Sequence, residues 1–265
     1  MAVARRDHSV TALQNGQVLV AGGWGSSPLS SCELFDPATN EWTSTGSMNS
    51  ARFGYTATLL LDERVLVAGG AYLTSVELFN PSFGTWTVGT SMNIARGWHS
   101  STLLSNGNVL VAGGSYGSAL NSAELFSPSS GGWTTVAPMS TARYAHTAAL
   151  LPNGFVLVAG GYGTTFLSSA ELYDPSLNTW TGSAMSVARG DATMAVLSNG
   201  NALVCGGYAG SAIYLSSCDI YNSQSNTWTV TTSMSTVRWC SASKQQGFGH
   251  WWSDFFGGSV LERNF

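Results

Sequence analysis

Short apolar runs alternate with clusters of Gly, Asn, Ser and Asp along most of the 265-residue chain. Runs such as Val-Leu-Val-Ala are rich in β-branched residues and too short for buried helices, so they predict β-strands. Asn-Gly dipeptides join several pairs of runs, and Asn-Gly tolerates the positive φ that a type I′ hairpin turn requires. These predicted hairpins lie at Asn15-Gly16, Asn106-Gly107, Asn153-Gly154 and Asn199-Gly200. Asp62-Glu63 replaces the dipeptide once, which predicts a looser turn or one of another type.

A longer period organises these strands. The tripeptide Ala-Gly-Gly, or Cys-Gly-Gly in the last copy, recurs with spacings of 47, 44, 47 and 46 residues. Its first glycines are Gly22, Gly69, Gly113, Gly160 and Gly206. An Ala-Arg pair precedes each diglycine, an acidic residue follows it in an apolar run, and a Trp-Thr pair closes the unit. The chain therefore contains five complete copies of one module.

Each module is expected to fold as four strands. The hairpin supplies the first two, the apolar run with the acidic residue supplies the third, and the Trp-Thr segment supplies the fourth. Proline after Asp36 and after Asp174 ends the third strand, because proline cannot donate a ladder hydrogen bond. One sheet of this size cannot cover both of its faces, whereas stacking of modules around an axis buries them. A β-propeller is therefore the expected architecture.

The module resembles the kelch repeat in its Ala-Arg start, its Val-Leu-Val-Ala-Gly-Gly strand, its Ala-Glu-Leu-Tyr-Asp-Pro strand and its Asn-Thr-Trp-Thr strand. The resemblance covers residues 1–242 and implies an all-β, kelch-type β-propeller of four-stranded blades with the first strand innermost. A sixth unit begins at Met234 and Val237-Arg238, and residues 243–265 form a degenerate C-terminal segment. A defective sixth blade is favoured over a five-bladed ring with a stray tail and over a fragment.

Composition narrows the range of partners. Apolar residues make up 44% of the chain, charged residues make up 9%, and Lys244 is the only lysine. Nucleic acid is not an expected partner, because the net charge is −4 and no basic stripe is present. No membrane partner is expected, since no apolar run reaches the length of a membrane span. The first residues lack the apolar core of a secretory signal, so a cytoplasmic location is slightly favoured.

Cysteine and histidine predict no metal site and no cofactor. The cysteines lack zinc-ligand spacing and are expected to be small buried thiols. They are Cys32, Cys205, Cys218 and Cys240. Cys205 and Cys218 flank one predicted hairpin loop, and their pairing in an oxidising compartment is the alternative. Three histidines, expected to form loop hydrogen bonds, share a repeat position that Tyr or Ala occupies in other modules. They are His8, His99 and His146.

Six arginines occupy one repeat-matched position, and in a propeller such residues form a ring that could bind an acidic ligand. They are Arg5, Arg52, Arg96, Arg143, Arg189 and Arg238. A matched acid follows in five modules, at Glu33, Glu77, Glu124, Glu171 and Asp219. The structural alternative is that each module buries its own arginine and acid as a pair, because an uncompensated buried charge is costly.

Residues beside the arginines vary between modules, as a binding surface does, and an aromatic residue follows each diglycine. The first group contains Phe53, Trp98, Tyr144, Asp191 and Trp239. The second group contains Trp24, Tyr72, Tyr116, Tyr162 and Tyr208. The kelch resemblance implies that both groups share one face with the arginines, and these residue types dominate binding hot spots. The alternative is that the rings cover loop glycines or pack between blades.

The favoured function is a non-catalytic binding or scaffold module that recognises a protein or peptide through this face, with a glycan as a further ligand class. A galactose-oxidase-like enzyme is an alternative that the resemblance admits. The copper site it implies needs paired histidines, tyrosines and a cross-linked cysteine, and the sequence has no such constellation. A substrate-receptor role, as in ubiquitin-ligase adaptors, would need another subunit to supply the helical region. We therefore expect no enzymatic activity.

Overall fold

A computed structural model describes residues 1–238, which fold into five antiparallel four-stranded sheets. Blade 1 consists of β1 (Ser9–Ala12), β2 (Val18–Ala21), β3 (Cys32–Asp36) and β4 (Glu41–Thr45). Blade 2 consists of β5 (Thr56–Leu59), β6 (Val65–Ala68), β7 (Val76–Asn80) and β8 (Thr85–Val88). Blade 3 consists of β9 (Ser100–Leu103), β10 (Val109–Ala112), β13 (Ala123–Ser127) and β14 (Gly132–Val136). Its β10–β13 loop carries a ribbon of β11 (Ser115–Tyr116) and β12 (Ser118–Ala119).

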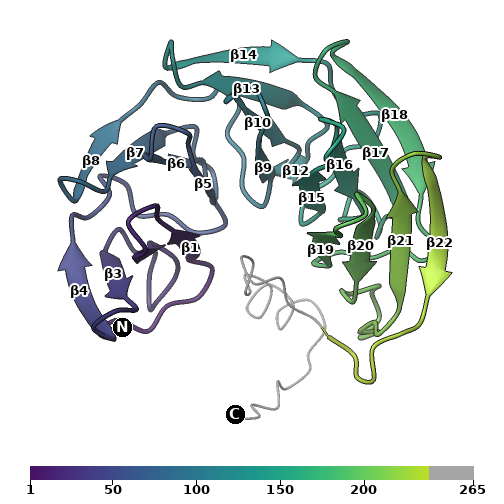
Figure 1. Cartoon of the computed structure of the whole chain (residues 1–265), viewed down its shortest axis with the longest axis horizontal. Helices are drawn as coiled ribbons and strands as arrows, with labels where there is room; N and C mark the ends of the chain where they lie inside the picture. Colours follow the sequence, from purple (N-terminus) through teal and green to yellow (C-terminus); the bar gives the residue numbers. More distant parts are fainter. Residues whose placement is uncertain (239–265) are drawn as a thin grey trace.

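The last two blades repeat this order. Blade 4 consists of β15 (Thr147–Leu150), β16 (Val156–Ala159), β17 (Ser169–Asp174) and β18 (Thr179–Ala184). Blade 5 consists of β19 (Thr193–Val196), β20 (Ala202–Cys205), β21 (Cys218–Asn222) and β22 (Thr227–Thr231). The predicted all-β propeller of four-stranded blades is confirmed, with the first strand of each module innermost and the Trp-Thr strand on the rim (Figure 1).

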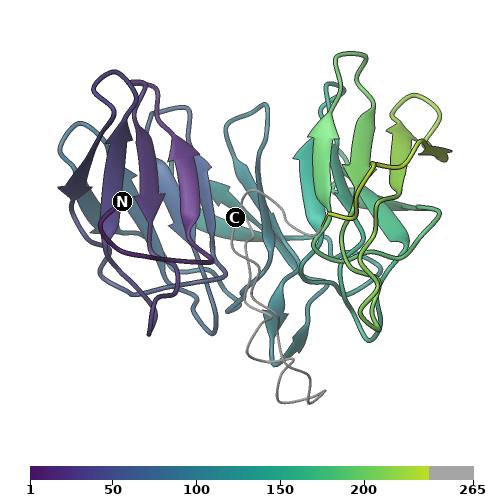
Figure 2. The ribbon, with the colours of Figure 1, turned by 90° about the horizontal axis from the view of Figure 1, so that it is seen from below.

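The described blades form an open arc. The innermost strands contact one another in sequence, from β1 to β5, β9, β15 and β19. Within residues 1–238, no contact of similar extent joins β19 to β1, and Figure 1 shows the arc ending at blades 1 and 5. Seen from the side, the strands of each blade run between two faces of the molecule (Figure 2). The β1–β2 type hairpin turns therefore lie on one face, and the loops that follow the diglycines lie on the other.

The hairpin turns differ from the sequence prediction. A type I′ turn needs positive φ at both central residues, but only the glycine of each Asn-Gly has it, as at Gly16 with φ of 86°. Leu13 N–H donates to Gln17 O and Gly16 N–H donates to Leu13 O, which fits a type I turn followed by a left-handed residue. Glu63 adopts φ of 70° at the matching position. The type I′ prediction is therefore wrong. Asp62-Glu63 forms the same turn as the Asn-Gly modules, whereas a looser turn or one of another type was expected.

The diglycines are required by the close approach of neighbouring blades. Gly113 has φ of 64°, and its N–H donates to Ser122 O within the blade. A Cβ on Gly113 would lie 2.5 Å from Arg143 O of the next blade. Gly114 N–H donates to that same Arg143 oxygen at 2.8 Å. A side chain at Gly113 would therefore push apart the two blades that the diglycine joins.

The apolar core lies between blades. At the interface of blades 2 and 3, Leu66 of β6 and Met92 of the connection between the blades pack in a single cluster with Val111 and Phe126 of blade 3. The rim tryptophan of each later blade also donates its indole N–H to the preceding blade, as Trp133 does to Thr90 O at 2.9 Å. These contacts explain why each module keeps its apolar pattern and its tryptophan.

Cysteine pairing departs from the favoured prediction. Cys205 and Cys218 are opposite each other on β20 and β21 and form a disulfide. Cys32 is a buried free thiol, as predicted, and burial raises its pKa to about 11. Cys240 lies outside the described residues. A disulfide persists in oxidising compartments, so it opposes the cytoplasmic location that the sequence slightly favours.

Candidate functional site

Five of the predicted arginines lie inside the blades. In blade 3, Arg96 is fully buried, and its Nη1 donates to Gly113 O at 2.6 Å and Ser122 O at 3.0 Å. Its Nη2 donates to Ser122 Oγ at 3.1 Å and to Glu124 Oε1 at 2.9 Å. Burial lowers the pKa of the Arg96 guanidinium, and the Glu124 carboxylate opposes that shift. Each arginine therefore fastens the loop that follows its own diglycine.

The acidic partner extends this fastening to the neighbouring blade. Glu77 accepts hydrogen bonds from the backbone N–H groups of Asn49 and Ser50, in the connection from blade 1, and an ion pair from Arg52 at 2.7 Å. Burial alone would raise the pKa of Glu77, but the hydrogen bonds from Asn49 and Arg52 lower it. The carboxylate is thus held ionised between two blades.

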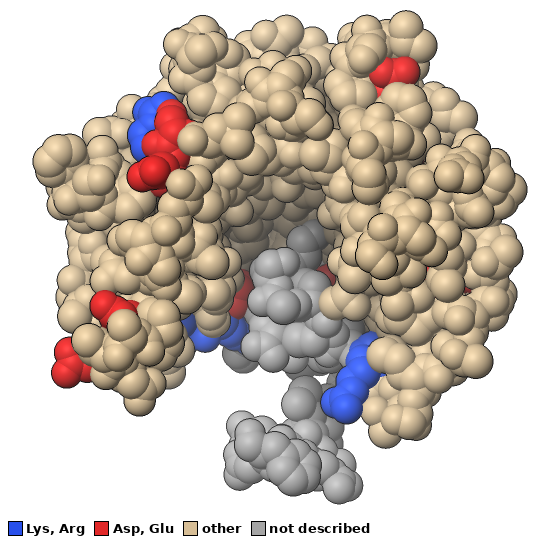
Figure 3. Space-filling view, in the orientation of Figure 1, with Lys and Arg blue, Asp and Glu red and all other residues tan. Residues whose placement is uncertain are grey.

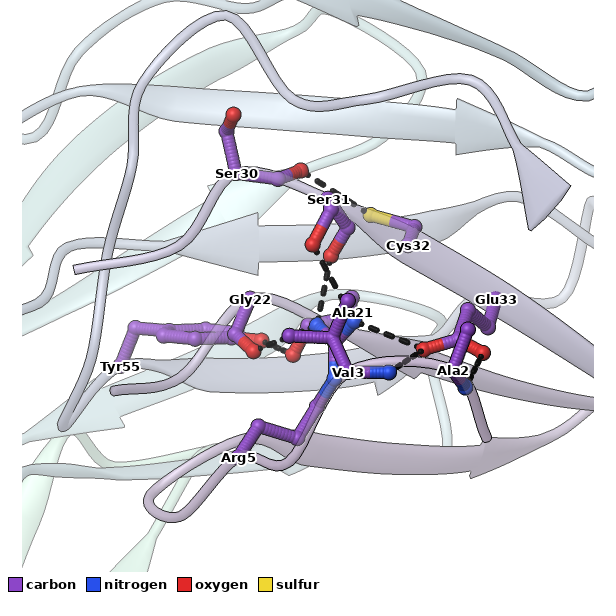
Figure 4. A network of polar contacts seen from close by, with 10 residues as sticks. All are labelled: Ala2, Val3, Arg5, Ala21, Gly22, Ser30, Ser31, Cys32, Glu33 and Tyr55. Carbon is purple, nitrogen blue, oxygen red and sulfur yellow. Dashed lines mark hydrogen bonds and ion pairs between the residues drawn. The ribbon is translucent and has the colours of Figure 1, made fainter. Parts of the chain in front are cut away.

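Figure 4 shows the same network in blade 1. Arg5 donates to Gly22 O, Ser31 and Glu33, and the other carboxylate oxygen of Glu33 accepts from Ala2 N–H at 2.6 Å. Ala2 therefore stands where Asn49 stands in the connection between blades 1 and 2. The network recurs from blade 1 to blade 5 with Asp219 as the fifth acid.

These contacts assign the five arginines to the frame. Their side chains have no exposed surface in the ion pairs with Glu33, Glu77, Glu124, Glu171 and Asp219, so the structural alternative fits their positions. Arg238 differs, because its side chain is exposed although its backbone bonds to blade 5 as the other arginines bond to theirs. Trp239 lies outside the described residues.

The predicted aromatic residues gather on the face of the diglycine loops. Phe53 contacts both Trp24, with ring centroids 4.8 Å apart, and Trp98, at 6.1 Å. Tyr72 and Tyr116 lie 6.2 Å apart, and their exposed fractions are 63% and 55%. These contacts link the loops of blades 1 to 3. We call this surface, together with its continuation on blades 4 and 5, the aromatic loop face.

On blades 4 and 5 the aromatic loop face continues as a chain of rings. Tyr144 contacts Tyr162, Tyr162 contacts Phe166, Phe166 contacts Tyr208, and Tyr208 contacts Tyr214, with centroids 5.1 to 5.4 Å apart. Sequence reasoning missed Phe166 and Tyr214. Both follow the diglycine in loops that fold back on Tyr162 and Tyr208 through β-bridges. An aromatic residue a few positions beyond the first one was the signal that could have revealed them.

Backbone hydrogen bonds link the loops that precede the innermost strands of neighbouring blades. Trp98 N–H donates to Gly54 O, Ala145 N–H to Trp98 O and Asp191 N–H to Ala145 O, at 2.7 to 2.9 Å. Each of these residues has a positive φ, as does Asp7 at the same repeat position. Backbone strain of this kind is stored where the surrounding structure fixes it. These backbone hydrogen bonds therefore fix the residues beside the arginines relative to the neighbouring blade.

Asp7 is a further residue that sequence reasoning missed. Burial raises its pKa to about 7, with Arg6 opposing the rise and Asp191 adding to it. Asp7 and Asp191 come from the first and last described blades at one repeat position. Asp191 thus interacts electrostatically with Asp7 and with Tyr144, whose pKa burial raises to about 12.

The histidines join innermost strands of neighbouring blades. His99 Nε2 lies 2.8 Å from Thr56 Oγ1, and His146 Nε2 lies 2.9 Å from Ser100 Oγ. Tyr55 at the same repeat position lies 2.9 Å from Ser9 Oγ and donates to Ala21 O. His99 and His146 lie in the loops just before β9 and β15, and their partners are hydroxyl groups on the innermost strand of the preceding blade, which agrees with the predicted loop hydrogen-bonding role.

A cavity of about 170 Å³ lies against the innermost strands. Its lining is mainly hydroxyl groups and small side chains, including Ser9, Thr56, Ser100, Thr147 and Ala192. Residues 1–238 contain no group of three or more His, Cys, Asp or Glu side chains that could hold a metal ion. That stretch of the chain also has no helix long and apolar enough to cross a membrane.

Five radially arranged four-stranded sheets, fastened at a repeated diglycine and joined by a rim tryptophan, define the molecule as a β-propeller protein. The sequence matches the Kelch motif over residues 4–49, 99–140, 142–182 and 194–235, and the chain belongs to the Kelch motif family. No match was found among curated proteins.

Solved structures support the same architecture. The chain is similar to the protein in "Structure of YjhT", with a TM-score of 0.72 and 14% sequence identity. The similarity covers 86% of this chain and 84% of that chain. At this identity the likeness concerns the fold alone.

Proposed function

We propose that the chain is a non-catalytic recognition module that binds a protein or peptide through the aromatic loop face. The observation that carries the proposal is the difference between repeated and varied positions. Each blade buries an arginine with a Glu or Asp partner, whereas the residues beside the arginines differ between blades. Tyr72, Tyr116 and Tyr214 of the aromatic loop face are exposed, and its other rings are half-buried. The repeated arginine–acid pairs can therefore support loops whose side chains differ from blade to blade.

The chemistry of the face suits a peptide. Tyr and Trp offer large, rigid contact areas at low cost in conformational entropy, and they are enriched in binding hot spots. The edge-to-face contacts among Trp24, Phe53 and Trp98 and among Tyr162, Phe166 and Tyr208 hold the rings in fixed orientations. Less ordering is then needed on binding, which favours affinity.

Charge contributes little to this proposal. Charged residues are 9% of the chain. Figure 3, which draws the face of the hairpin turns opposite the aromatic loop face, shows scattered charged side chains there. The five buried arginines are already engaged by acids and carbonyl groups. A ligand that depends on aromatic and backbone contacts therefore suits the molecule better than a polyanion.

A peptide-display selection on the immobilised full chain tests the proposal. The wild type should enrich peptides with a common motif, and a variant carrying Tyr72→Ser, Tyr116→Ser and Tyr214→Ser should lose most of that enrichment. Hot-spot truncation costs about 2 kcal/mol or more per residue. The matched control is Phe83→Ser with Leu177→Ser, which removes exposed apolar side chains from the β3–β4 type turns on the opposite face.

The control should keep the enrichment. A folded wild type that enriches no motif, or equal loss in both variants, contradicts the proposal. Enrichment of glycans on an array in place of peptides would move the ligand to a different class and would also contradict it. An enzymatic turnover that survives the three substitutions would count against a non-catalytic role.

A further inference from the structure

Five side chains on blades 4 and 5 form one continuous row of rings on the aromatic loop face. Each ring contacts the next, with centroids 5.1 to 5.4 Å apart and ring planes inclined to each other by 46° to 81°. In order they are Tyr144, Tyr162, Phe166, Tyr208 and Tyr214, and we call them the aromatic row. Because each plane is turned against its neighbour, the row presents ring faces and ring edges in alternation.

The backbone beneath the aromatic row is already paired. Tyr144 and Tyr162 exchange both of their backbone hydrogen bonds, at 2.9 and 2.8 Å. Tyr208 exchanges the same two bonds with Gly190, also at 2.8 and 2.9 Å. An extended peptide that adds a strand to a sheet needs unpaired backbone groups at an edge. These residues do not offer such an edge, so a ligand of the row must bind to the rings.

The middle of the aromatic row is held rigidly. A Cβ added to Gly190 would lie 3.2 Å from the Phe166 ring, and one added to Gly210 would lie 3.1 Å from it. The ring therefore packs directly on the backbone of blade 5. Ala212 N–H donates to the Tyr208 hydroxyl at 3.1 Å, which fixes the next ring. A rigid row loses little conformational entropy when it binds a partner that is itself rigid.

The charges around the aromatic row do not favour an acidic peptide. Arg143 and Arg189, the arginines of blades 4 and 5, are buried in ion pairs. Burial raises the pKa of Tyr144, and the Tyr162 phenol and the Asp191 carboxylate add to that rise. An acidic or phosphorylated segment, which clusters of accessible arginine recognise, would meet a carboxylate here instead. The row therefore suits an uncharged segment.

We propose, resting on the peptide recognition proposed above, that the aromatic row binds a proline-rich segment in the polyproline II conformation. This conformation has no internal hydrogen bonds and is already populated before binding, so little ordering is needed. Proline-rich segments dock on aromatic side chains in other recognition modules through the same preformed helix. They need neither a strand edge nor a cation, which agrees with the paired backbone and the buried arginines.

The spacing of the rings agrees with the repeat of this helix. Polyproline II rises about 3.1 Å per residue with three residues per turn, so equivalent residues lie about 9 Å apart. Tyr162 and Tyr208 lie on either side of Phe166, and each is 5.1 Å from it between ring centroids. Prolines three residues apart can therefore reach alternate rings, which predicts Pro-x-x-Pro spacing in the ligand.

Two mirror-image probes test the proposal on the full chain. Decaproline made of L-residues forms the left-handed polyproline II helix, and D-decaproline forms its mirror image with the same composition and charge. Fluorescence anisotropy of the labelled probes measures both affinities. The L-probe should bind at least roughly tenfold more tightly than the D-probe, because only its helix has the hand of a natural ligand.

Two single substitutions place the L-probe on the face. Tyr214→Ser removes the exposed ring at the end of the aromatic row and should weaken binding roughly tenfold. Tyr72→Ser is the matched control, since it removes an exposed tyrosine of the same face on blade 2 and should leave the affinity unchanged. Equal affinity for the two probes, no binding of the L-probe at millimolar concentration, or equal losses in the two variants overturns the proposal.

The peptide-display selection separates this proposal from the one it rests on. Enrichment of prolines at three-residue spacing supports both. A motif without such prolines overturns the proline-rich ligand and leaves peptide recognition standing. A folded chain that enriches no motif contradicts both.

Discussion

The buried arginine networks and the aromatic loop face lie side by side, but the first stabilise the blades and the second forms their surface. Sequence reasoning groups them as one candidate surface because arginine and aromatic residues both mark binding hot spots. The structure separates them, since Arg96 is fully buried whereas Tyr116 in the same blade is 55% exposed. The buried arginines and acids hold the frame, and the loop aromatics lie on its surface. The expected effects of substitution should divide in the same way.

The largest effect is expected from breaking one buried pair. Arg143→Ala should lower the free energy of unfolding by about 3 to 5 kcal/mol, because it leaves Glu171 buried without its cation. Urea denaturation measures the change. Arg64→Ala is the control, since Arg64 pairs with Asp62 on the surface and should cost less than about 1 kcal/mol. Similar losses for the two variants would erase the distinction between frame and surface.

A smaller effect is expected at the diglycine. Gly113→Ala should cost at least about 2 kcal/mol, from the left-handed backbone and from the contact of the new Cβ with Arg143 O at 2.5 Å. Gly131→Ala isolates the backbone term, because Gly131 has φ of 68° with no atom within 4 Å of an added Cβ. It should cost about 1 to 2 kcal/mol. Thermal unfolding of both variants measures the difference, and equal costs would contradict the role of close approach.

Loss of a contact between innermost strands should be milder. His146→Ala removes the hydrogen bond to Ser100 Oγ at 2.9 Å and should cost about 1 kcal/mol. Blade 5 already carries alanine at this position, as Ala192, and keeps its fold. Urea denaturation measures the change. A loss as large as that of Arg143→Ala would mean that these histidines belong to the frame as fully as the arginines do.

A pH dependence is expected from Asp7. Because burial raises the pKa of Asp7 from 3.8 to about 7, the folded state holds this proton more tightly than the unfolded state does. The associated stability is fully present below pH 3.8 and is lost as pH rises through about 7. Asp7→Asn should therefore flatten the fall in unfolding free energy between pH 5 and pH 7 relative to wild type.

Asp62→Asn is the control for this pH dependence. Burial alone would raise the pKa of Asp62, but hydrogen bonds from Arg64 lower it below 3.8. The stability that Asp62 contributes is therefore lost only as pH falls below 3.8. The slope between pH 5 and pH 7 should stay as in wild type. An unchanged slope in Asp7→Asn as well would contradict the raised pKa of Asp7.

Much of the fold could be predicted from the sequence because the module repeats. Gly-Gly, the acid and Trp-Thr recur in register, so one reading of strands and turns was tested five times along the chain. The turn type was wrong because Asn15 does not take the positive φ that its residue type allows, and only the residue after it does, as Gly16 here and Glu63 in blade 2. Local propensity does not fix the turn when the strands on both sides are held by neighbouring blades.

The site was less predictable for a physical reason. Residue type marks Arg5 and Tyr72 equally as hot-spot candidates. Only the packing shows that Arg5 is buried and donates to Gly22 O, whereas Tyr72 is exposed. Phe166 and Tyr214 were missed because their loops fold back after the diglycine, which no periodicity records. The cysteine pair was visible as an alternative, and the register of β20 with β21 decided it.

The most direct test compares two single substitutions in one blade, Arg96→Ala and Tyr116→Ala, each measured for unfolding free energy and for binding of the selected peptide. The account predicts that Arg96→Ala loses about 3 to 5 kcal/mol of stability. Tyr116→Ala should keep its stability to within about 0.5 kcal/mol and lose peptide affinity. A stable Arg96→Ala that no longer binds, or a destabilised Tyr116→Ala that binds as wild type does, would contradict the division between frame and surface.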